Sequence, residues 1–258
     1  MSKKVVFRVD CGRLIGSGHL MRCLALARIF KNINYQCFFV AYDFSKKIIE
    51  KEINKEFKII YLNSFKYKKN KDQFEKIIFN HKTNIYASKE KYEFLNIIKS
   101  RIKNVEMIIV DHYGISYEWE KFIKTKYNKK LVIIDDYLNR PHFCDYLIDP
   151  TGQFKKNRND KIKYVLSGTK YLILNKNFKK SKIYKKKYIF ISFGSMDKLA
   201  MSLKILNVLI KLNLNYKIVV AISKFSKSYE KLSKYENENK IKICNKIKDL
   251  NYFINRSV

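Results

Sequence analysis

The chain has 258 residues, of which 47% are hydrophobic and 15% aromatic, which is enough apolar material for one large core or two moderate ones. Its formal net charge is +32, from 55 Lys and Arg against 23 Asp and Glu. The basic residues are spread along the whole length and no nucleic-acid-binding module accompanies them, so we interpret them as a solvated lysine-rich surface. Such a surface still attracts an anionic nucleotide.

Neither the cysteines nor the apolar runs indicate secretion or a membrane. The five cysteines are odd in number and form no Cys-x-x-Cys pair, which argues against a disulfide framework and a zinc site. No apolar run is long enough to span a bilayer, and the first residues lack the apolar stretch of a secretion signal. We expect a cytoplasmic protein with no membrane partner, no metal and no cofactor.

The first predicted strand, 5–7, leads into a glycine loop and a helix. Three of the seven glycines, Gly12, Gly16 and Gly18, lie in this loop, and apolar residues over 20–27 recur at the spacing of a helix face. Glycines between a strand and a helix let the backbone turn tightly and let a ligand approach closely. The pattern predicts a ligand-binding loop, although the full dinucleotide motif Gly-x-Gly-x-x-Gly is absent.

His19 follows this loop directly, in the first turn of the predicted helix. The positive end of the helix dipole disfavours an added proton there and attracts an anion, which suits a general base. The alternative is a histidine that caps the helix or fills space.

Further apolar runs in the first half predict strands at 35–42, 58–62, 107–110, 131–134 and 142–150. The run 107–110 ends in Asp111, His112, Tyr113 and Gly114. Polar residues after a buried parallel strand lie at the carboxyl edge of the sheet, where the glycine loop also lies, so both could face one crevice. For Asp111 and His112, helix capping or packing under the sheet is the alternative.

Asp135 and Asp136 follow the strand at 131–134. Consecutive strand residues point to opposite faces, so the two carboxylates do not easily share a metal ion. We favour a structural or ligand-contacting role over metal binding.

The second half repeats the order of strand, glycine turn and helix. A strand over 188–193 stops at Gly194 and Ser195, and Asp197 precedes a helical pattern over 199–212. The start of such a helix can hold a diphosphate through backbone N–H groups. Further elements are expected as strands at 217–222 and 240–244 and a helix at 250–254.

We therefore expect an α/β protein with two Rossmann-like domains. Residues 1–150 form the first domain, with the glycine loop and His19, and the polar stretch 151–186 connects the two. Residues 187–258 form a nucleotide-binding second domain that is incomplete, because only about three strand–helix units are present.

The residues from Arg8 to Ala27 read R-x-D-x-x-x-x-I-G-x-G-H-x-x-R-C-L-A-L-A. This string resembles the N-terminus of the UDP-2,4-diacetamido-2,4,6-trideoxy-beta-L-altropyranose hydrolases of pseudaminic acid biosynthesis. Later matches follow in the same order, at 108–115, 133–136, 144–149 and 168–174. The resemblance implies a fold of the GT-B glycosyltransferase type, with the chain ending short of the family's C-terminal part. Ser195 replaces the second of two glycines usual in the family.

The resemblance also implies the chemistry. The substrate would be a UDP-linked 2,4-diacetamido-2,4,6-trideoxyhexose, cut at the anomeric carbon without a metal to give UDP and the free sugar, for pseudaminic acid biosynthesis and flagellin glycosylation. His19 is the implied catalytic residue. The implied substrate-binding residues are Asp10, Gly16, Ser17, Gly18, Arg22, Tyr113, Gly194, Ser195 and Asp197.

Three alternatives remain open at this stage. A glycosyltransferase of the same fold would use the same base on an acceptor hydroxyl, and an inactive truncated homologue would keep the fold alone. A basic nucleic-acid binder would show an affinity that falls steeply with salt. The sequence does not predict an oligomeric state.

Overall fold

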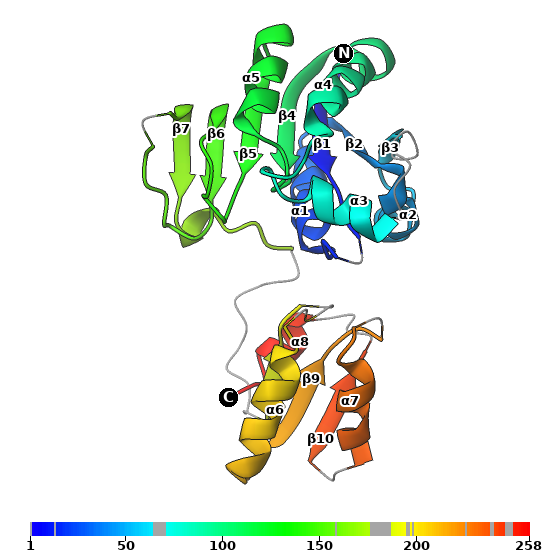
Figure 1. The fold of residues 1–258 in the computed structure, drawn as a ribbon, viewed down its shortest axis with the longest axis vertical. Coiled ribbons are helices and arrows are strands. Elements are labelled where there is room, and N and C mark those ends of the chain that lie inside the picture. The colour runs from blue at the N-terminus through cyan, green and yellow to red at the C-terminus, as the bar shows by residue number, and fades with distance from the viewer. Residues whose placement is uncertain are drawn as a thin grey trace. The chain divides into compact units, whose positions relative to one another are not determined.

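In the computed structural model, the chain folds into two compact units, Met1–Leu174 and Asn175–Val258, and each has its own parallel sheet (Figure 1). The structure describes residues 2–12, 14–63, 71–157, 159–175, 187–194, 197, 199–224, 226–237, 240–245 and 250–258.

The first unit contains a seven-stranded sheet in the order β3-β2-β1-β4-β5-β6-β7, in which all neighbouring strands pair in parallel. Its strands are β1 (Lys4–Val9), β2 (Gln36–Tyr42), β3 (Lys58–Leu62), β4 (Val105–Asp111), β5 (Lys130–Ile134), β6 (Phe143–Asp149) and β7 (Lys161–Ser167). Its α-helices are α1 (Gly18–Asn32), α2 (Lys46–Ile53), α3 (Lys71–Ile78), α4 (Ala87–Asn96) and α5 (Tyr117–Lys126).

Helices cover both faces of this sheet. Because side chains alternate along a strand, Val5 and Phe7 of β1 pack into a cluster with α1 and α2, whereas Val6 packs into another with α3, α4 and α5. The inner strands β1, β2, β4 and β5 are buried on both faces and read as nearly continuous apolar runs, as expected for a parallel sheet.

The strand order reverses between β1 and β4. The chain leaves β1 toward β2 on one side and leaves β4 toward β5 on the other. The carboxyl ends of the two strands are adjacent, since Val9 pairs with Asp111 in the ladder. In open α/β sheets, ligands bind in the crevice outside such a switch point. The loop after β1 and the residues after β4 both start there.

The segment expected to connect the domains contributes instead to the first sheet. Residues Lys161–Ser167 form β7, which pairs with β6 at the sheet edge, and the first unit extends to Leu174. Edge strand β7 is largely exposed, and Lys163 interrupts its apolar residues. Of the expected connecting segment, residues 158 and 176–186 lie outside the described part of the chain.

The second unit contains a three-stranded sheet in the order β10-β9-β8. Its strands are β8 (Tyr188–Ser192), β9 (Lys217–Ala221) and β10 (Ile241–Cys244), and its α-helices are α6 (Met201–Lys211), α7 (Tyr229–Ser233) and α8 (Leu250–Ile254). Leu206 of α6, Leu232 of α7 and Val220 of β9 lie in one apolar core. The strands predicted by residue range, and the helices predicted over 199–212 and 250–254, are found within two residues of their predicted bounds. The first helix, expected from the apolar spacing over 20–27, is longer and spans Gly18–Asn32.

Candidate functional site

The glycine loop between β1 and α1 is stabilised by hydrogen bonds within its own backbone and by hydrogen bonds to Glu75 of α3. Gly12 and Gly16 exchange two backbone hydrogen bonds, and Gly16 has a positive φ of 83°. The carboxylate Oε1 of buried Glu75 accepts the N–H groups of Leu14 and Ile15 at 2.5 and 2.6 Å. A Cβ on Gly12 would lie 2.3 Å from this oxygen, so Gly12 is needed for the close approach of the carboxylate.

The open side of the loop is at the start of α1. Added Cβ atoms on Gly16 and Gly18 would meet nothing within 4 Å. The N-cap residue Ser17 makes no side-chain capping bond, and the first turn holds no acidic residue. The first N–H groups of a helix lack intrahelical partners, so this helix start can receive an anion or a polar group of a ligand.

His19 lies in the first turn of α1, as predicted, and its ring is oriented by Asp111 at the end of β4. The Nδ1 atom of His19 donates a hydrogen bond to Asp111 Oδ1. Because a carboxylate only accepts, the proton belongs on Nδ1, which leaves Nε2 of the neutral ring as an acceptor. The contact shows that His19 is held by a partner on a neighbouring strand and does not merely fill space.

Asp111 is fully buried and also binds Arg22 and Cys23. Burial by itself would raise the pKa of Asp111, but the contacts with His19 and Arg22 outweigh burial and hold this pKa below its usual value. Asp111 is therefore an anion that orients the histidine. The alternative of helix capping or packing under the sheet, considered for Asp111 from the sequence, does not describe this contact.

Arg22, one helical turn after His19, links two carboxylates. Its Nε and Nη2 atoms donate to Asp111, and its Nη1 donates to Asp136 Oδ2 at 2.9 Å. All three nitrogens of the guanidinium are therefore engaged within the protein. Arg22 was predicted to bind substrate; a direct contact would share or replace one of these bonds, and its observed contacts are those of a positioning residue.

Aromatic side chains pack against the imidazole of His19. The rings of Tyr113 and Phe79 lie edge-on to His19, with centroid distances of 4.5 and 5.3 Å, and Tyr137 lies 4.7 Å from Tyr113. The hydroxyl of Tyr113 donates to Asp136 Oδ1. Burial and this carboxylate raise the pKa of Tyr113, so its hydroxyl stays protonated as a donor.

The two adjacent aspartates after β5 point to different sites and bind different partners, as the alternation of strand residues predicts. Asp136 joins Arg22 and Tyr113, whereas buried Asp135 binds Arg140 Nη1 at 2.7 Å and His142 Nε2 at 3.0 Å. Asp135 thus belongs to a structural network, and Asp136 to the candidate site.

Asp10, predicted to bind substrate, is buried beneath the site. Its carboxylate accepts from Arg8 Nη1 at 2.8 Å and from the N–H of Tyr42 at 2.7 Å, and Nε2 of His112 lies 3.1 Å away. Arg8 in turn binds Glu90 of α4. Asp10 is 1% exposed, so its observed role is to fix the end of β1, and any contact with substrate remains a prediction.

In the second unit, Gly194 lies just after β8 and has a positive φ of 76°, which is the tight turn the sequence predicts. Asp197 accepts the N–H groups of Met201 and Ser202, at 2.9 and 2.8 Å, at the start of α6. These are the groups that were expected to hold a diphosphate, so Asp197 occupies them itself and acts as a helix cap. Ser195 lies outside the described residues.

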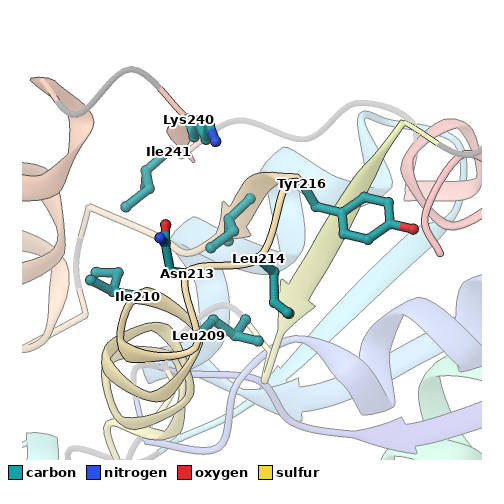
Figure 2. A pocket seen from close by; sticks show the side chains of 8 residues that line it. Leu209, Ile210, Asn213, Leu214, Tyr216, Lys240 and Ile241 are labelled. Atoms are coloured by element: carbon teal, nitrogen blue, oxygen red, sulfur yellow. The ribbon is translucent and has the colours of Figure 1, made fainter.

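The second unit also has a cavity of about 290 Å³ near the C-terminal end of α6 (Figure 2). Its lining residues are Leu209, Ile210, Asn213, Leu214, Tyr216, Ile218, Lys240 and Ile241. It lies at the amino ends of β9 and β10, opposite the edge where open α/β sheets bind ligands, and its lining offers no carboxylate or imidazole. We therefore place the candidate active site at the switch point of the first unit.

Three residues of this site make contacts that the sequence analysis did not predict. Asp111 was noted but given no role, Asp136 was one of an adjacent pair, and Glu75 lay in a polar stretch. The signal for Asp111 and Asp136 was their place directly after a buried strand. Nothing local marks Glu75, which reaches the loop across 60 residues of chain.

Within the described part of the chain, no helix is long and apolar enough to cross a membrane. No protein-family model matches the sequence.

The sequence is 28% identical over 239 residues to the UDP-2,4-diacetamido-2,4,6-trideoxy-beta-L-altropyranose hydrolase of Campylobacter jejuni, which covers 90% of this chain and 74% of that protein. Among solved structures, MurG of Acinetobacter baumannii matches with a TM-score of 0.59 at 10% identity, over 99% of this chain and 71% of that one. A putative UDP-N-acetylglucosamine 2-epimerase of Listeria monocytogenes matches with a TM-score of 0.57 at 13% identity, over 100% and 73%.

The structural matches confirm the predicted α/β fold with two Rossmann-like domains of the GT-B type. The similarity along 90% of the chain confirms the resemblance that the motifs indicated, which is to the UDP-2,4-diacetamido-2,4,6-trideoxy-beta-L-altropyranose hydrolase family.

Proposed function

We propose that this protein hydrolyses a UDP-linked 2,4-diacetamido-2,4,6-trideoxyhexose at the anomeric carbon and releases UDP and the free sugar. The observation that carries the proposal is the His19–Asp111 pair at the switch point, in a chain similar to a hydrolase of this substrate class. This activity belongs to pseudaminic acid biosynthesis, for which the product is a precursor.

The geometry supports a direct attack of water. Nε2 of His19 accepts a proton from water as the water oxygen bonds to the anomeric carbon, and the bond from that carbon to the UDP oxygen breaks. The electron pair of the broken bond leaves with UDP. UDP is a stable anion, so its departure needs little acid assistance, and we propose that the reaction requires no metal.

The protein groups around His19 suit this step. Asp111 keeps the proton on Nδ1 and stabilises the imidazolium that forms, as the carboxylate does in a Ser-His-Asp triad. The open start of α1, at Gly16, Ser17 and Gly18, is where we propose that a polar or phosphate oxygen of the substrate binds. Tyr113 positions the sugar beside the imidazole.

The test is UDP release from the purified chain, with UDP-2,4-diacetamido-2,4,6-trideoxyhexose as substrate, with EDTA and without acceptor. His19→Ala is expected to fold normally and to release UDP at least about a hundredfold more slowly, the low end of general-base catalysis. Unchanged turnover in the folded variant would remove His19 from the mechanism, and loss of wild-type activity in EDTA would overturn the metal-independent reaction.

A glycosyltransferase is the second candidate, because the solved structures with this fold include a glycosyltransferase of Rickettsia africae and because an acceptor hydroxyl can replace water beside the same base. UDP release that depends on an added sugar acceptor would select the transferase. A folded chain that binds the nucleotide sugar but releases no UDP under either condition would identify an inactive homologue.

A further inference from the structure

Asp136 differs from Asp111 in that a ligand can reach it. The Asp136 side chain is 29% exposed, while that of Asp111 is fully buried. Each Asp136 oxygen accepts one protein bond, from Tyr113 to Oδ1 and from Arg22 to Oδ2. A carboxylate has about four acceptor positions, so Asp136 keeps acceptor capacity on its exposed side.

The charges around His19 determine which part of a substrate can approach Asp136. Asp111 and Asp136 are two carboxylates that share the single guanidinium of Arg22, and His19 is neutral when it acts as a base. This cluster therefore carries a net negative charge. A diphosphate beside Asp136 would be repelled, whereas a sugar N–H or O–H group would be attracted.

An apolar surface lies beside this carboxylate. Tyr137 follows Asp136 directly, its side chain is 66% exposed, and its ring lies against that of Tyr113. A carboxylate next to exposed aromatic rings suits a sugar that has both hydrogen-bond donors and apolar C–H faces. A 6-deoxy sugar with acetamido groups has both.

We propose that Asp136 is the sugar-binding carboxylate of the site, held in place by Tyr113 and Arg22, and that it accepts a hydrogen bond from an N–H or O–H group of the sugar. This assignment deepens the proposed function and rests on it for the identity of the sugar. It also orients the substrate, with the sugar at Asp136 and the diphosphate away from it.

The test measures binding of two probes separately, the free 2,4-diacetamido-2,4,6-trideoxyhexose and UDP, by calorimetry or ligand-observed NMR. Asp136→Asn is expected to weaken binding of the free sugar about tenfold or more, since a bond to a charged acceptor is lost, and to leave UDP binding unchanged. The control is Asp145→Asn, which removes a carboxylate of β6 that is 19% exposed and paired with Lys124 of α5. This control is expected to bind both probes as the wild type does.

Three results would overturn the assignment: no binding of the free sugar by the wild type, unchanged sugar affinity in Asp136→Asn, or an equal loss of sugar and UDP affinity. Tyr113→Phe, which frees Oδ1 of Asp136 from its donor, gives a second test if the first variant fails to fold. We expect it to weaken sugar binding severalfold and to spare UDP; unchanged sugar binding contradicts the proposal.

The hydrolase proposal can fail separately. Sugar binding that depends on Asp136, together with no UDP release by the wild type, would support the sugar site and reject the hydrolase.

Discussion

Replacing Asp111 by Asn tests whether the carboxylate at the end of β4 orients His19, the proposed general base. Asp111 accepts bonds from both His19 and Arg22 while fully buried. Asparagine has nearly the same shape, but its NH₂ group turns a donor toward one of these partners. With the amide donor at Nδ1, the ring would carry its proton on Nε2 and could not accept one from water.

For the comparable change in a Ser-His-Asp triad, the loss in kcat is about 10⁴-fold, and we expect a loss of about 10³- to 10⁴-fold here. Breaking a buried ion pair costs about 3 to 5 kcal/mol of folding stability. Arg22 keeps its bond to Asp136, so we expect a cost near the lower limit. The fold should therefore survive while the activity does not.

The assay measures UDP release and thermal unfolding of Asp111→Asn beside Asp149→Asn. Asp149 is also fully buried at the end of a strand of the same sheet, but its carboxylate binds Thr151, Ser167 and the N–H of Phe154. The control should lose stability and keep kcat. A folded Asp111→Asn variant with less than about tenfold loss of kcat would refute the role of Asp111 in orienting His19.

Two further predictions concern folding. Burial would lower the pKa of His142, but Glu120 and Asp135 outweigh it and raise this pKa to about 9, above the ordinary 6.5. The protonated His142 therefore contributes about 3 kcal/mol at most to folding stability, in full below pH 6.5, and this contribution is lost as the pH rises through 9. In a plot of unfolding free energy against pH, His142→Gln should flatten the slope over this range. An identical slope in the variant would contradict the assignment. Gly12→Ala places a methyl group against Glu75 and should destabilise the protein by about 1 to 3 kcal/mol in denaturant unfolding, with partial recovery when Glu75→Ala is added; no recovery would show that the clash lies elsewhere.

The sequence predicted the strands well because a parallel sheet covered on both faces requires apolar runs. The exception was Lys161–Ser167, a largely exposed edge strand in which Lys163 interrupts the apolar residues. The position of His19 was also predictable, because the local sequence pattern indicates the strand, the glycine loop and the helix. The partners of His19 were not, because Asp111 reaches it across 92 residues through the pairing of β1 with β4.

The predicted diphosphate site at the second glycine turn shows a different limit. The pattern of strand, glycine, aspartate and helix is the same whether the aspartate faces a ligand or caps the helix. In the structure, Asp197 occupies two of the first N–H groups of α6. The start of α1 has no such acidic residue, so the two similar motifs offer different binding capacity. Only the side-chain geometry separates them.

Lysine and arginine have different roles in this protein. Lysine dominates the surplus of positive charge, and none of the described lysines is buried, so this charge lies at the surface. The described buried ion networks are built on arginines instead: Arg8 links Asp10 with Glu90, Arg22 links Asp111 with Asp136, and Arg140 binds Asp135. A planar guanidinium can bridge two carboxylates at fixed angles, which an ammonium group cannot do. The site is consequently acidic inside a protein of strongly positive net charge. The surface can attract a nucleotide sugar from a distance, while the local charge around His19 favours the sugar end of that molecule over its diphosphate.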